Sequence, residues 1–393
     1  MSLLNATAAP STAAPSTAAP STTAPSTTAP SGAAPSTTAP STTAPSGAGP
    51  SQLPERLRLA PGRAAVWRSP TCLQLGLDPQ RAMVLDGLPE PLAALLRRMD
   101  GVRGTAELVA EAQTAGSAAG DALAMLTELH RSGLVQDASA ADHGPPGWHR
   151  VALATEATSW SVHTTCATRR VLRQRREAAV RVVGSGRVAV ALATMLAAAG
   201  VGRVVVEATG TVAATDLGTG YLPGDLGRSR AAAAADAVRR CAPGVIVAAR
   251  RPVDLIVLCD MVVAEPVVVA ELLAAGIPHL IGYAHEGTAM VGPLVWPGRS
   301  SCLRCAELHR ADLDLAWPKL AAQLVGQVPA GGLACTQLAA ALTAEQVLAT
   351  LAGPGAGLPV PPTWGAALEL DPVRGTWRRH PRPAHPRCGC GAR

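Results

Sequence analysis

The feature that most constrains this chain is a glycine turn between an apolar run and a helix-like segment. Residues 179–207 read AVRVVGSGRVAVALATMLAAAGVGRVVVE, which predicts a strand, a turn, a helix and a second strand. The turn follows the G-x-G-x-x-A pattern through Gly184, Gly186 and Ala189. Ser185 separates the two glycines. The first glycine permits a tight turn, the second lets backbone approach a phosphate at the helix N-terminus, and the third small residue lets helix pack on strand.

An acidic residue follows this turn at the distance that a nucleotide site requires. Glu207 ends the second strand about 20 residues on, where a carboxylate accepts hydrogen bonds from ribose hydroxyls. The turn and Glu207 together predict a nucleotide site; the alternative is a Rossmann-type domain that has lost its ligand.

Helix-like and strand-like segments then alternate. Parallel strands joined by helices predict an α/β class with a doubly wound Rossmann-type sheet. One buried strand ends in Asp260. The segments are DLGRSRAAAAADAVRRCAPG (225–244, helix), VIVAARRP (245–252, strand), VDLIVLCD (253–260, strand), VVVAELLAAG (267–276, helix) and IPHLIGYA (277–284, strand).

Four of the nine cysteines form two close pairs. Cys302 and Cys305 follow a Pro-Gly turn, whereas Cys388 and Cys390 lie in HPRCGCGAR near the C-terminus. Thiolates bind zinc tetrahedrally, so two such pairs predict a structural zinc site that folds a C-terminal tail back on the domain. Free thiol pairs are the alternative, and the other candidate ligands are His309, His380 and His385.

One further cysteine, Cys335, lies at the start of an apolar helix. A helix N-terminus lowers a thiol pKa, so a nucleophile is one interpretation. A buried core cysteine is the interpretation that we favour.

The first third of the chain has a different character. Residues 1–51 repeat APST-like units, which cannot bury enough apolar surface to fold, so we predict a disordered tail. Residues 52–140 carry strand-like runs at 64–69, 72–77 and 82–87, followed by three helix-like segments. This order predicts a small winged-helix-like α+β domain. HGPPG breaks regular structure, so residues 141–178 are interpreted as a connector.

Composition excludes several classes of function. Lys319 is the only lysine, which excludes a Walker phosphate loop. The net charge of +6 comes with only 2% aromatic residues and no aromatic-interleaved basic patch, so we expect no nucleic-acid partner. Secretory and membrane-spanning patterns are absent, so we expect a cytoplasmic protein.

Residues 52–138 resemble the PqqD-like peptide-recognition domain of ribosomal peptide natural-product pathways. The segments LQLGLDPQRAMVLDGLPEPLAALLRRMDGVR and LTELHRSGLV carry the resemblance. It implies that a precursor's leader peptide adds a strand to a sheet edge, in a groove between the third strand and the third helix. The residues carried over are Met83, Val84 and Leu85, facing Leu126 and Leu129; the alternative is that these are core residues.

Residues 179–393 resemble the ThiF-like, ubiquitin-activating adenylyltransferase family. The matching segments include the glycine turn, DLGRSRAAAA, DLIVLCD, GPLVWPGRSSCLRC and GGLACTQLAAALTAEQVLATLAG. The resemblance implies a nucleotide-binding domain at 179–352 that uses ATP and magnesium to transfer AMP to a carboxylate. It implies that the cysteine pairs fix a tail, residues 353–393, to the body. Asp260 matches the acidic residue near magnesium, and Arg230 stands where a phosphate-binding lysine is expected.

The loop after the second strand departs from the family pattern. Thr209 or Gly210 stands where a second acidic residue is expected, Asp216 replaces an asparagine, and Thr219 stands near an expected arginine. Adenylylation develops charge on the α-phosphate and requires cations there. The catalytic set is therefore predicted to be incomplete.

Three functions remain open. The first is an adenylyltransferase that acts on a peptide or small protein in natural-product biosynthesis, with Asp260 and Arg230 as its catalytic residues. The second is a non-catalytic leader-peptide-binding partner that delivers a precursor to a separate cyclodehydratase. The third, an NAD-dependent oxidoreductase, fits the glycine turn but does not explain the cysteine pairs. We expect a homodimer.

Overall fold

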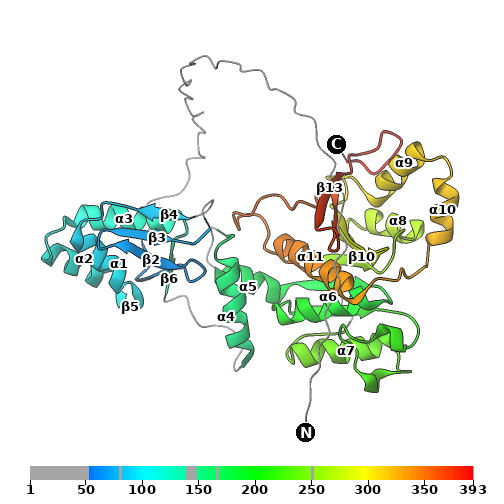
Figure 1. Ribbon diagram of the computed structural model, residues 1–393, viewed down its shortest axis with the longest axis horizontal. Coiled ribbons are helices and arrows are strands. Elements are labelled where there is room, and N and C mark those ends of the chain that lie inside the picture. The colour runs from blue at the N-terminus through cyan, green and yellow to red at the C-terminus, as the bar shows by residue number, and fades with distance from the viewer. Residues whose placement is uncertain (1–52, 79–81, 139–147, 165–167, 249–251, 393) are drawn as a thin grey trace, which may run out of the picture. The chain divides into compact units, whose positions relative to one another are not determined.

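A computed structural model gives the fold of most of the chain (Figure 1). The predicted tail, residues 1–51, and the HGPPG segment, residues 143–147, lie outside the described residues. No helix within the described residues is long and apolar enough to span a membrane. The described ranges are 53–78, 82–138, 148–164, 168–248 and 252–392.

Residues 53–138 form an α+β unit with two small sheets. The first sheet has the order β5-β1-β6 and consists of β1 (Arg56–Leu59), β5 (Asp100–Gly104) and β6 (Val135–Asp137). The second has the order β2-β3-β4 and consists of β2 (Ala65–Ser69), β3 (Cys72–Leu75) and β4 (Met83–Leu85). The helices are α1 (Glu90–Arg98), α2 (Thr105–Thr114) and α3 (Ala119–Arg131).

The strand-like and helix-like runs predicted for this unit occur as β2, β3, β4 and α1 to α3. Strands β1 and β5 were not predicted. The run RLRL of β1 is short and half charged, and DGVRG of β5 contains two glycines. Their pairing depends on partners distant in sequence, since Arg56 lies opposite Gly104 and Leu57 opposite Asp137.

Two helices lie in the segment predicted as a connector. They are α4 (Trp148–Trp160) and α5 (Thr168–Glu177). Arg175 of α5 is fully buried, donates to a Glu156 carboxylate oxygen at 3.1 Å, and lies 4.2 Å from the centre of the Trp160 ring. This paired and stacked cation joins α5 to α4.

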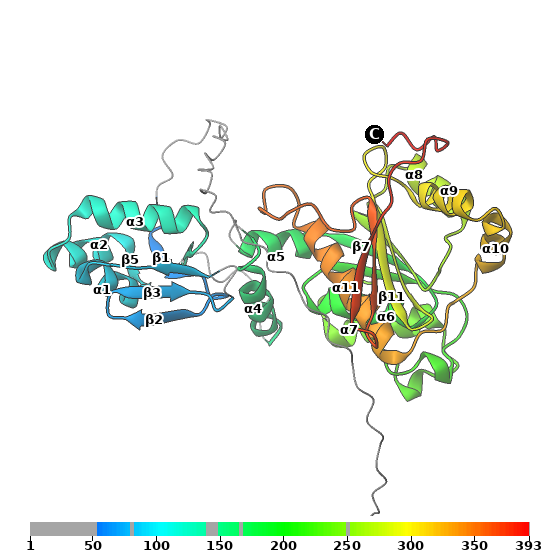
Figure 2. The same ribbon diagram turned by 45° about the horizontal axis from the view of Figure 1, so that its top comes forward.

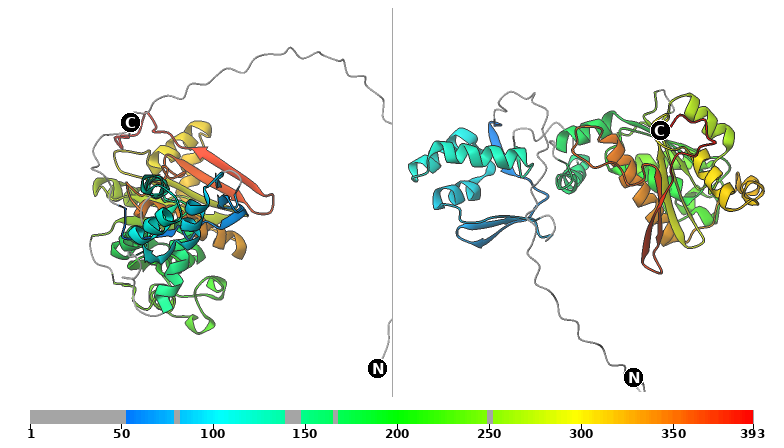
Figure 3. Two further views of the ribbon diagram at one scale, coloured as in Figure 1. Left: turned by 90° about the vertical axis from the view of Figure 1, so that its left-hand side faces the viewer. Right: turned by 90° about the horizontal axis from the view of Figure 1, so that it is seen from above.

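Seven strands form the large sheet of residues 168–392, in the order β13-β12-β11-β10-β9-β7-β8. The expected parallel strands are β7 to β10, while β11 to β13 continue the sheet in antiparallel fashion, which makes it mixed. The C-terminal hairpin lies at one edge (Figure 3). The strands are β7 (Ala179–Val183), β8 (Arg203–Glu207), β9 (Leu255–Cys259), β10 (His279–His285), β11 (Thr288–Val295), β12 (Ala366–Asp371) and β13 (Thr376–Pro381).

Helices cover both faces of this sheet (Figure 2). One face carries α6 (Arg187–Ala198), α7 (Arg230–Cys241) and α11 (Leu333–Leu351). The other carries α8 (Pro266–Ala274), α9 (Leu303–Leu313) and α10 (Trp317–Leu324). Successive side chains of a strand point to opposite faces, so Leu255, Val257 and Cys259 of β9 enter one core, and Ile256 and Leu258 enter the other.

Small residues let helices approach the sheet closely in a chain without phenylalanine. A Cβ added at Gly282 of β10 would lie 2.4 Å from the hydroxyl oxygen of Thr343 on α11. Alanines 189, 193 and 197 of α6 are almost completely buried. The core is therefore built by close backbone approach rather than by large side chains.

One predicted strand is wrong. VIVAARRP contributes only an isolated bridge between Ile246 and Arg203 in its described part, and residues 249–251 lie outside the described residues. The apolar run is short, and its described part has no pairing partner in the sheet beyond this bridge.

Candidate functional site

The predicted nucleotide residues meet where the strand order of the large sheet reverses. From β7 the chain passes to β8 on one side of it, then returns to β9 on its other side. The glycine turn follows β7 and Asp260 follows β9, so both lie at the carboxyl ends of adjacent parallel strands. In open α/β sheets, ligands bind in the crevice at such a switch point.

Asp260 caps the helix that follows the glycine turn. The backbone N–H groups of Gly186, Val188 and Ala189 donate to its carboxylate at 2.9, 3.0 and 3.1 Å. Asp260 has a φ of +56°, a left-handed conformation that aspartate adopts more readily than most residues. The carboxylate thus occupies the α6 N-terminus, where a phosphate was predicted.

The two glycines of the turn make room for this carboxylate. A Cβ at Gly186 would lie 2.6 Å from the Asp260 carboxyl carbon. A Cβ at Gly184 would lie 2.7 Å from the carbonyl oxygen of Cys259 and 3.0 Å from an Asp260 carboxylate oxygen. In this structure the G-x-G pattern is explained by the close approach of β9 and its terminal carboxylate.

Burial raises the pKa of Asp260 to about 6, against the lowering effect of the three N–H donors. The negative charge of Asp216 acts in the raising direction too. Only 6% of Asp260 is exposed, so its ionised form depends on the helix N-terminus for stabilisation.

Arg230, the predicted phosphate ligand, is paired with a carboxylate of its own domain. Its Nε and one terminal nitrogen lie 3.0 and 2.9 Å from an Asp216 oxygen, and it donates to the Thr209 carbonyl at 3.2 Å. Asp216 is buried, as is Thr219, whose hydroxyl has no partner within the described residues. The hydroxyl of Tyr221 donates to the Arg230 carbonyl at 3.2 Å. Two of the departures noted in the sequence, Thr209 and Asp216, therefore contact Arg230.

The remaining predicted nucleotide residues link the two loops of the switch point. The Thr209 N–H donates to the Ser185 hydroxyl at 2.8 Å, which joins the glycine turn to the loop after β8. Glu207 has an exposed carboxylate at the end of β8, and one of its oxygens lies 3.3 Å from Arg181 Nε. Ala189 is buried against the sheet, as a small third residue requires.

The four paired cysteines come together, as predicted. Sulfur–sulfur distances are 3.8 Å for Cys302 and Cys305, 3.6 Å for Cys302 and Cys388, and 3.6 Å for Cys305 and Cys390. All four sulfurs lie within 4.8 Å of one another. Four thiolates bound tetrahedrally at about 2.3 Å from a zinc ion would lie about 3.8 Å apart, so the cluster has the dimensions of a metal site.

Other contacts hold the C-terminal segment beside α9 (Figure 1). The buried His385 ring lies 2.7 Å from an Asp312 oxygen, and Arg387 pairs with the same carboxylate. His309 contacts the Pro383 carbonyl at 3.2 Å, and His380 contacts Glu369 at 2.8 Å. The alternative histidine ligands are thus engaged elsewhere.

Cys335 is 5% exposed at the start of α11 and belongs to the main core. Burial raises the pKa of its thiol, with the charge of Asp371 acting in the same direction. Both observations favour a core cysteine over a nucleophile.

The predicted peptide-binding residues divide into two groups. Met83 and Val84 are exposed on β4, an edge strand whose one partner in the described structure is β3. Leu85 is partly buried, whereas Leu126 and Leu129 of α3 are buried in the core of this unit. The two α3 leucines therefore support packing here rather than line an open groove.

The family model described as ThiF family matches residues 164–392. The chain belongs to the ThiF family. Its match begins just before α5, so the family domain includes part of the segment predicted as a connector.

Solved structures share the fold at low sequence identity. Escherichia coli MccB with AMPCPP and MccA has a TM-score of 0.67 at 14% identity, over 86% of this chain and 99% of that chain. MccB with ATP has a TM-score of 0.63 at 15% identity, over 85% and 99%. The microcin C7 biosynthetic enzyme MccB with N-formylated MccA has a TM-score of 0.64 at 14% identity, over 86% and 99%. No curated protein matches the chain.

The cysteine cluster predicts a metal-dependent tail. We expect the purified protein to contain about one zinc ion per chain, and Cys388→Ser to lose it, because three thiolates hold zinc less firmly than four. Elemental analysis measures the zinc content, and thermal unfolding measures the Tm. Cys241→Ser, at a half-buried cysteine outside the cluster, should retain the metal and the wild-type Tm. Equal zinc content in the two variants would contradict the prediction.

The buried carboxylate predicts a pH dependence of stability. Because the pKa of Asp260 is raised from 3.8 to about 6, the folded protein holds a proton that the unfolded chain releases in this interval. The stability contributed by Asp260 is therefore full below about pH 4 and falls by up to about 3 kcal/mol as pH rises past 6. The variant Asp260→Asn should lack this loss.

The free energy of unfolding of both proteins, measured by denaturant titration from pH 4 to 7, checks this. Wild type should lose stability relative to the variant as pH rises. A difference that stays constant would show that the three N–H donors balance burial, and one of opposite slope would show that they outweigh it.

Proposed function

We propose that the chain is an ATP-dependent enzyme that activates a carboxylate of a peptide or small protein in natural-product biosynthesis. The observation that carries the proposal is the convergence of the α6 N-terminus, Asp260 and Arg230 at the switch point of a ThiF-family sheet. Structures of similar fold contain AMPCPP or ATP, and the microcin C7 biosynthetic enzyme among them contains N-formylated MccA.

The residues present fit a nucleotide with its magnesium ion. The three N–H groups that now bind Asp260 are those that an anionic phosphate would use at the α6 N-terminus. Asp260 released from them offers the hard oxygen ligand that magnesium prefers. Arg230 would contact phosphate, and the exposed Glu207 would accept ribose hydroxyls. Magnesium-bound ATP would supply the leaving pyrophosphate for carboxylate activation.

The chain's own carboxylates compete with these roles. Phosphate binding must displace Asp260 from the helix N-terminus, and Asp216 neutralises the guanidinium that would stabilise developing charge. We therefore expect slow adenylylation, with a substrate peptide contributing to the displacement. The four cysteines would hold a structural zinc ion away from this chemistry.

A second candidate is favoured by the same pairings. A protein whose anion site is filled by Asp260, and whose phosphate cation is paired with Asp216, could serve as a leader-peptide-binding partner for a separate cyclodehydratase. The exposed edge of β4 supports this role, since an extended peptide can pair with a free strand edge. A PqqD-like role for residues 52–138 is part of both candidates.

Exchange of pyrophosphate into ATP distinguishes the candidates. With a carboxylate-bearing substrate peptide, the wild type should catalyse exchange, and Asp260→Ala should lower the rate by about 100-fold or more. Arg230→Ala should lower it by at least about tenfold. Arg239→Ala is the matched control, because this exposed arginine lies on the same helix and pairs only with Asp236 among the described residues. Peptide binding without ATP binding or exchange would establish the second candidate.

The edge of β4 predicts where a leader peptide pairs. Val84→Asp should weaken binding of peptides selected from a displayed library by about tenfold, because it places a charge beside the added strand. Val66→Asp on the opposite edge strand, β2, is the matched control, since the two valines are 43% and 44% exposed. Fluorescence anisotropy measures both affinities. Equal weakening by the two variants would exclude a site at β4.

A further inference from the structure

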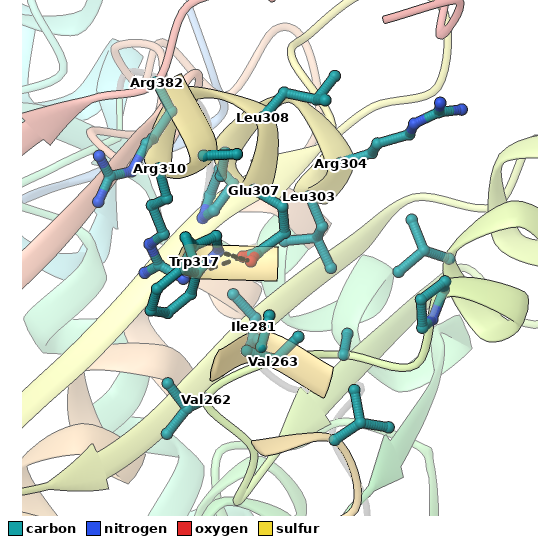
Figure 4. Close-up of a pocket in the computed structure, with 18 of the residues that line it drawn as sticks. Val262, Val263, Ile281, Leu303, Arg304, Glu307, Leu308, Arg310, Trp317 and Arg382 are labelled. Atoms are coloured by element: carbon teal, nitrogen blue, oxygen red, sulfur yellow. Dashed lines mark hydrogen bonds and ion pairs between the residues drawn. The ribbon is translucent and has the colours of Figure 1, made fainter. Parts of the chain in front are cut away.

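A cavity of about 510 Å³ lies against the sheet face that α8, α9 and α10 cover (Figure 4). Its volume falls within the range of small-molecule sites, roughly 300–1,000 Å³. None of the residues predicted for the nucleotide, cysteine or peptide sites lines it. It therefore shares no residue with those sites, although Leu303 in its lining is adjacent to Cys302 of the cysteine cluster.

Most of the lining is apolar. The sheet contributes Ile281 and Met290, α8 contributes Val269 and Leu273, and α9 contributes Leu303. Such a surface favours an aliphatic or aromatic body over a polar one, because burying apolar area is worth roughly 25 cal/mol per Å².

One end of the cavity carries charged groups. Glu307 accepts hydrogen bonds from Trp317 Nε1 at 2.7 Å and from an Arg310 terminal nitrogen at 2.9 Å. The Arg310 guanidinium also lies 4.9 Å from the centre of the Trp317 ring. Both oxygens of Glu307 are thus engaged, and its charge is balanced by Arg310.

Arg382, just after β13, supplies a second guanidinium at this end (Figure 4). It is half-buried, and no carboxylate within the described residues lies at ion-pair distance from it. Burial lowers the pKa of Arg382, and the neighbouring charge of Arg310 acts in the same direction, whereas Tyr283 and Glu307 act in the opposite direction. Two guanidiniums and one carboxylate leave one positive charge without a partner, beside an apolar cavity.

We propose that this cavity binds an organic carboxylate with an apolar body, its carboxylate on Arg382 and its body among the valine, leucine and isoleucine side chains. A guanidinium fork pairs with a carboxylate through two parallel hydrogen bonds, which fits a ligand of this charge and shape. The same chemistry is offered by a free medium-chain acid and by the C-terminal residue of a peptide.

Isothermal titration of the full chain with octanoate, N-acetylleucine and octylamine tests the proposal. At least one acid should bind, while octylamine, which has the opposite charge, should not. Arg382→Gln should weaken acid binding by about tenfold or more. Arg378→Gln is the matched control on β13, because this exposed arginine does not line the cavity and should change affinity less than about twofold.

A second variant tests the cavity without changing Arg382. Ala321→Trp fills the cavity from α10 and should abolish acid binding while leaving the Tm within a few degrees of wild type. Tighter binding of octanoate identifies free acids as the source. Tighter binding of N-acetylleucine, lost in N-acetylleucinamide, identifies a peptide C-terminus.

The proposal is overturned if neither acid binds, if octylamine binds as tightly as octanoate, or if Arg382→Gln and Arg378→Gln behave alike. None of these measurements requires ATP. Their outcome is therefore independent of the pyrophosphate exchange that tests the proposed function.

Discussion

The hydrogen bonds between Asp260 and the first turn of α6 organise the centre of the large sheet. They connect the end of β9 to the turn after β7, and they satisfy three backbone donors that a helix leaves free at its N-terminus. The glycines at 184 and 186 permit this approach because a side chain at either would collide with β9 or its carboxylate. The helix is held in place by an anion that the chain itself provides.

Arg230 is likewise paired with a charged group of the same chain. Two nitrogens of the Arg230 guanidinium lie within 3.0 Å of an Asp216 oxygen. The Tyr221 hydroxyl donates a hydrogen bond to the Arg230 carbonyl. Each group that would attract a phosphate is already satisfied by an internal partner. A nucleotide at this position would exchange one set of charge-assisted hydrogen bonds for another, so its net affinity depends on the difference between the two sets. If the nucleotide's hydrogen bonds are the stronger set, the protein can act as a slow enzyme; if the internal hydrogen bonds are stronger, it can act only as a binding protein.

The sequence predicts those strands and helices whose pattern of apolar residues matches the side chains that are buried in the fold. Strands β7, β9 and β10 are apolar runs between turn residues, and the cysteine pairs have metal-ligand spacing, so both are visible without coordinates. Strands β11 to β13 were not predicted. In β13 the run WRRH is polar and joins the sheet through its register with β12. The strand expected at 245–252 does not form, because a run of apolar residues alone does not provide a strand to pair with.

The site was predicted less completely than the fold, for physical reasons. The spacing of Gly184, Gly186 and Asp260 is visible in sequence, yet the capping role of Asp260 depends on two strands meeting at their ends. The unpaired charge of Arg382 has no sequence signal, because its neighbours Arg310 and Glu307 lie more than seventy residues away on α9. Likewise, the burial of Leu126 follows from which face of α3 meets the core.

The cysteine cluster joins positions 85 and 86 residues apart. A metal ion bound there would make the folding of the C-terminal segment depend on the free metal concentration. An ion bound only by the assembled cluster stabilises the folded state by a term that grows with the logarithm of the free ion concentration. The β12–β13 hairpin lies within the loop that the cluster closes, so a metal ion in the cluster would link the attachment of the sheet's last two strands to metal supply. The stability of this edge would then depend on the free metal concentration in the cell as well as on the chain.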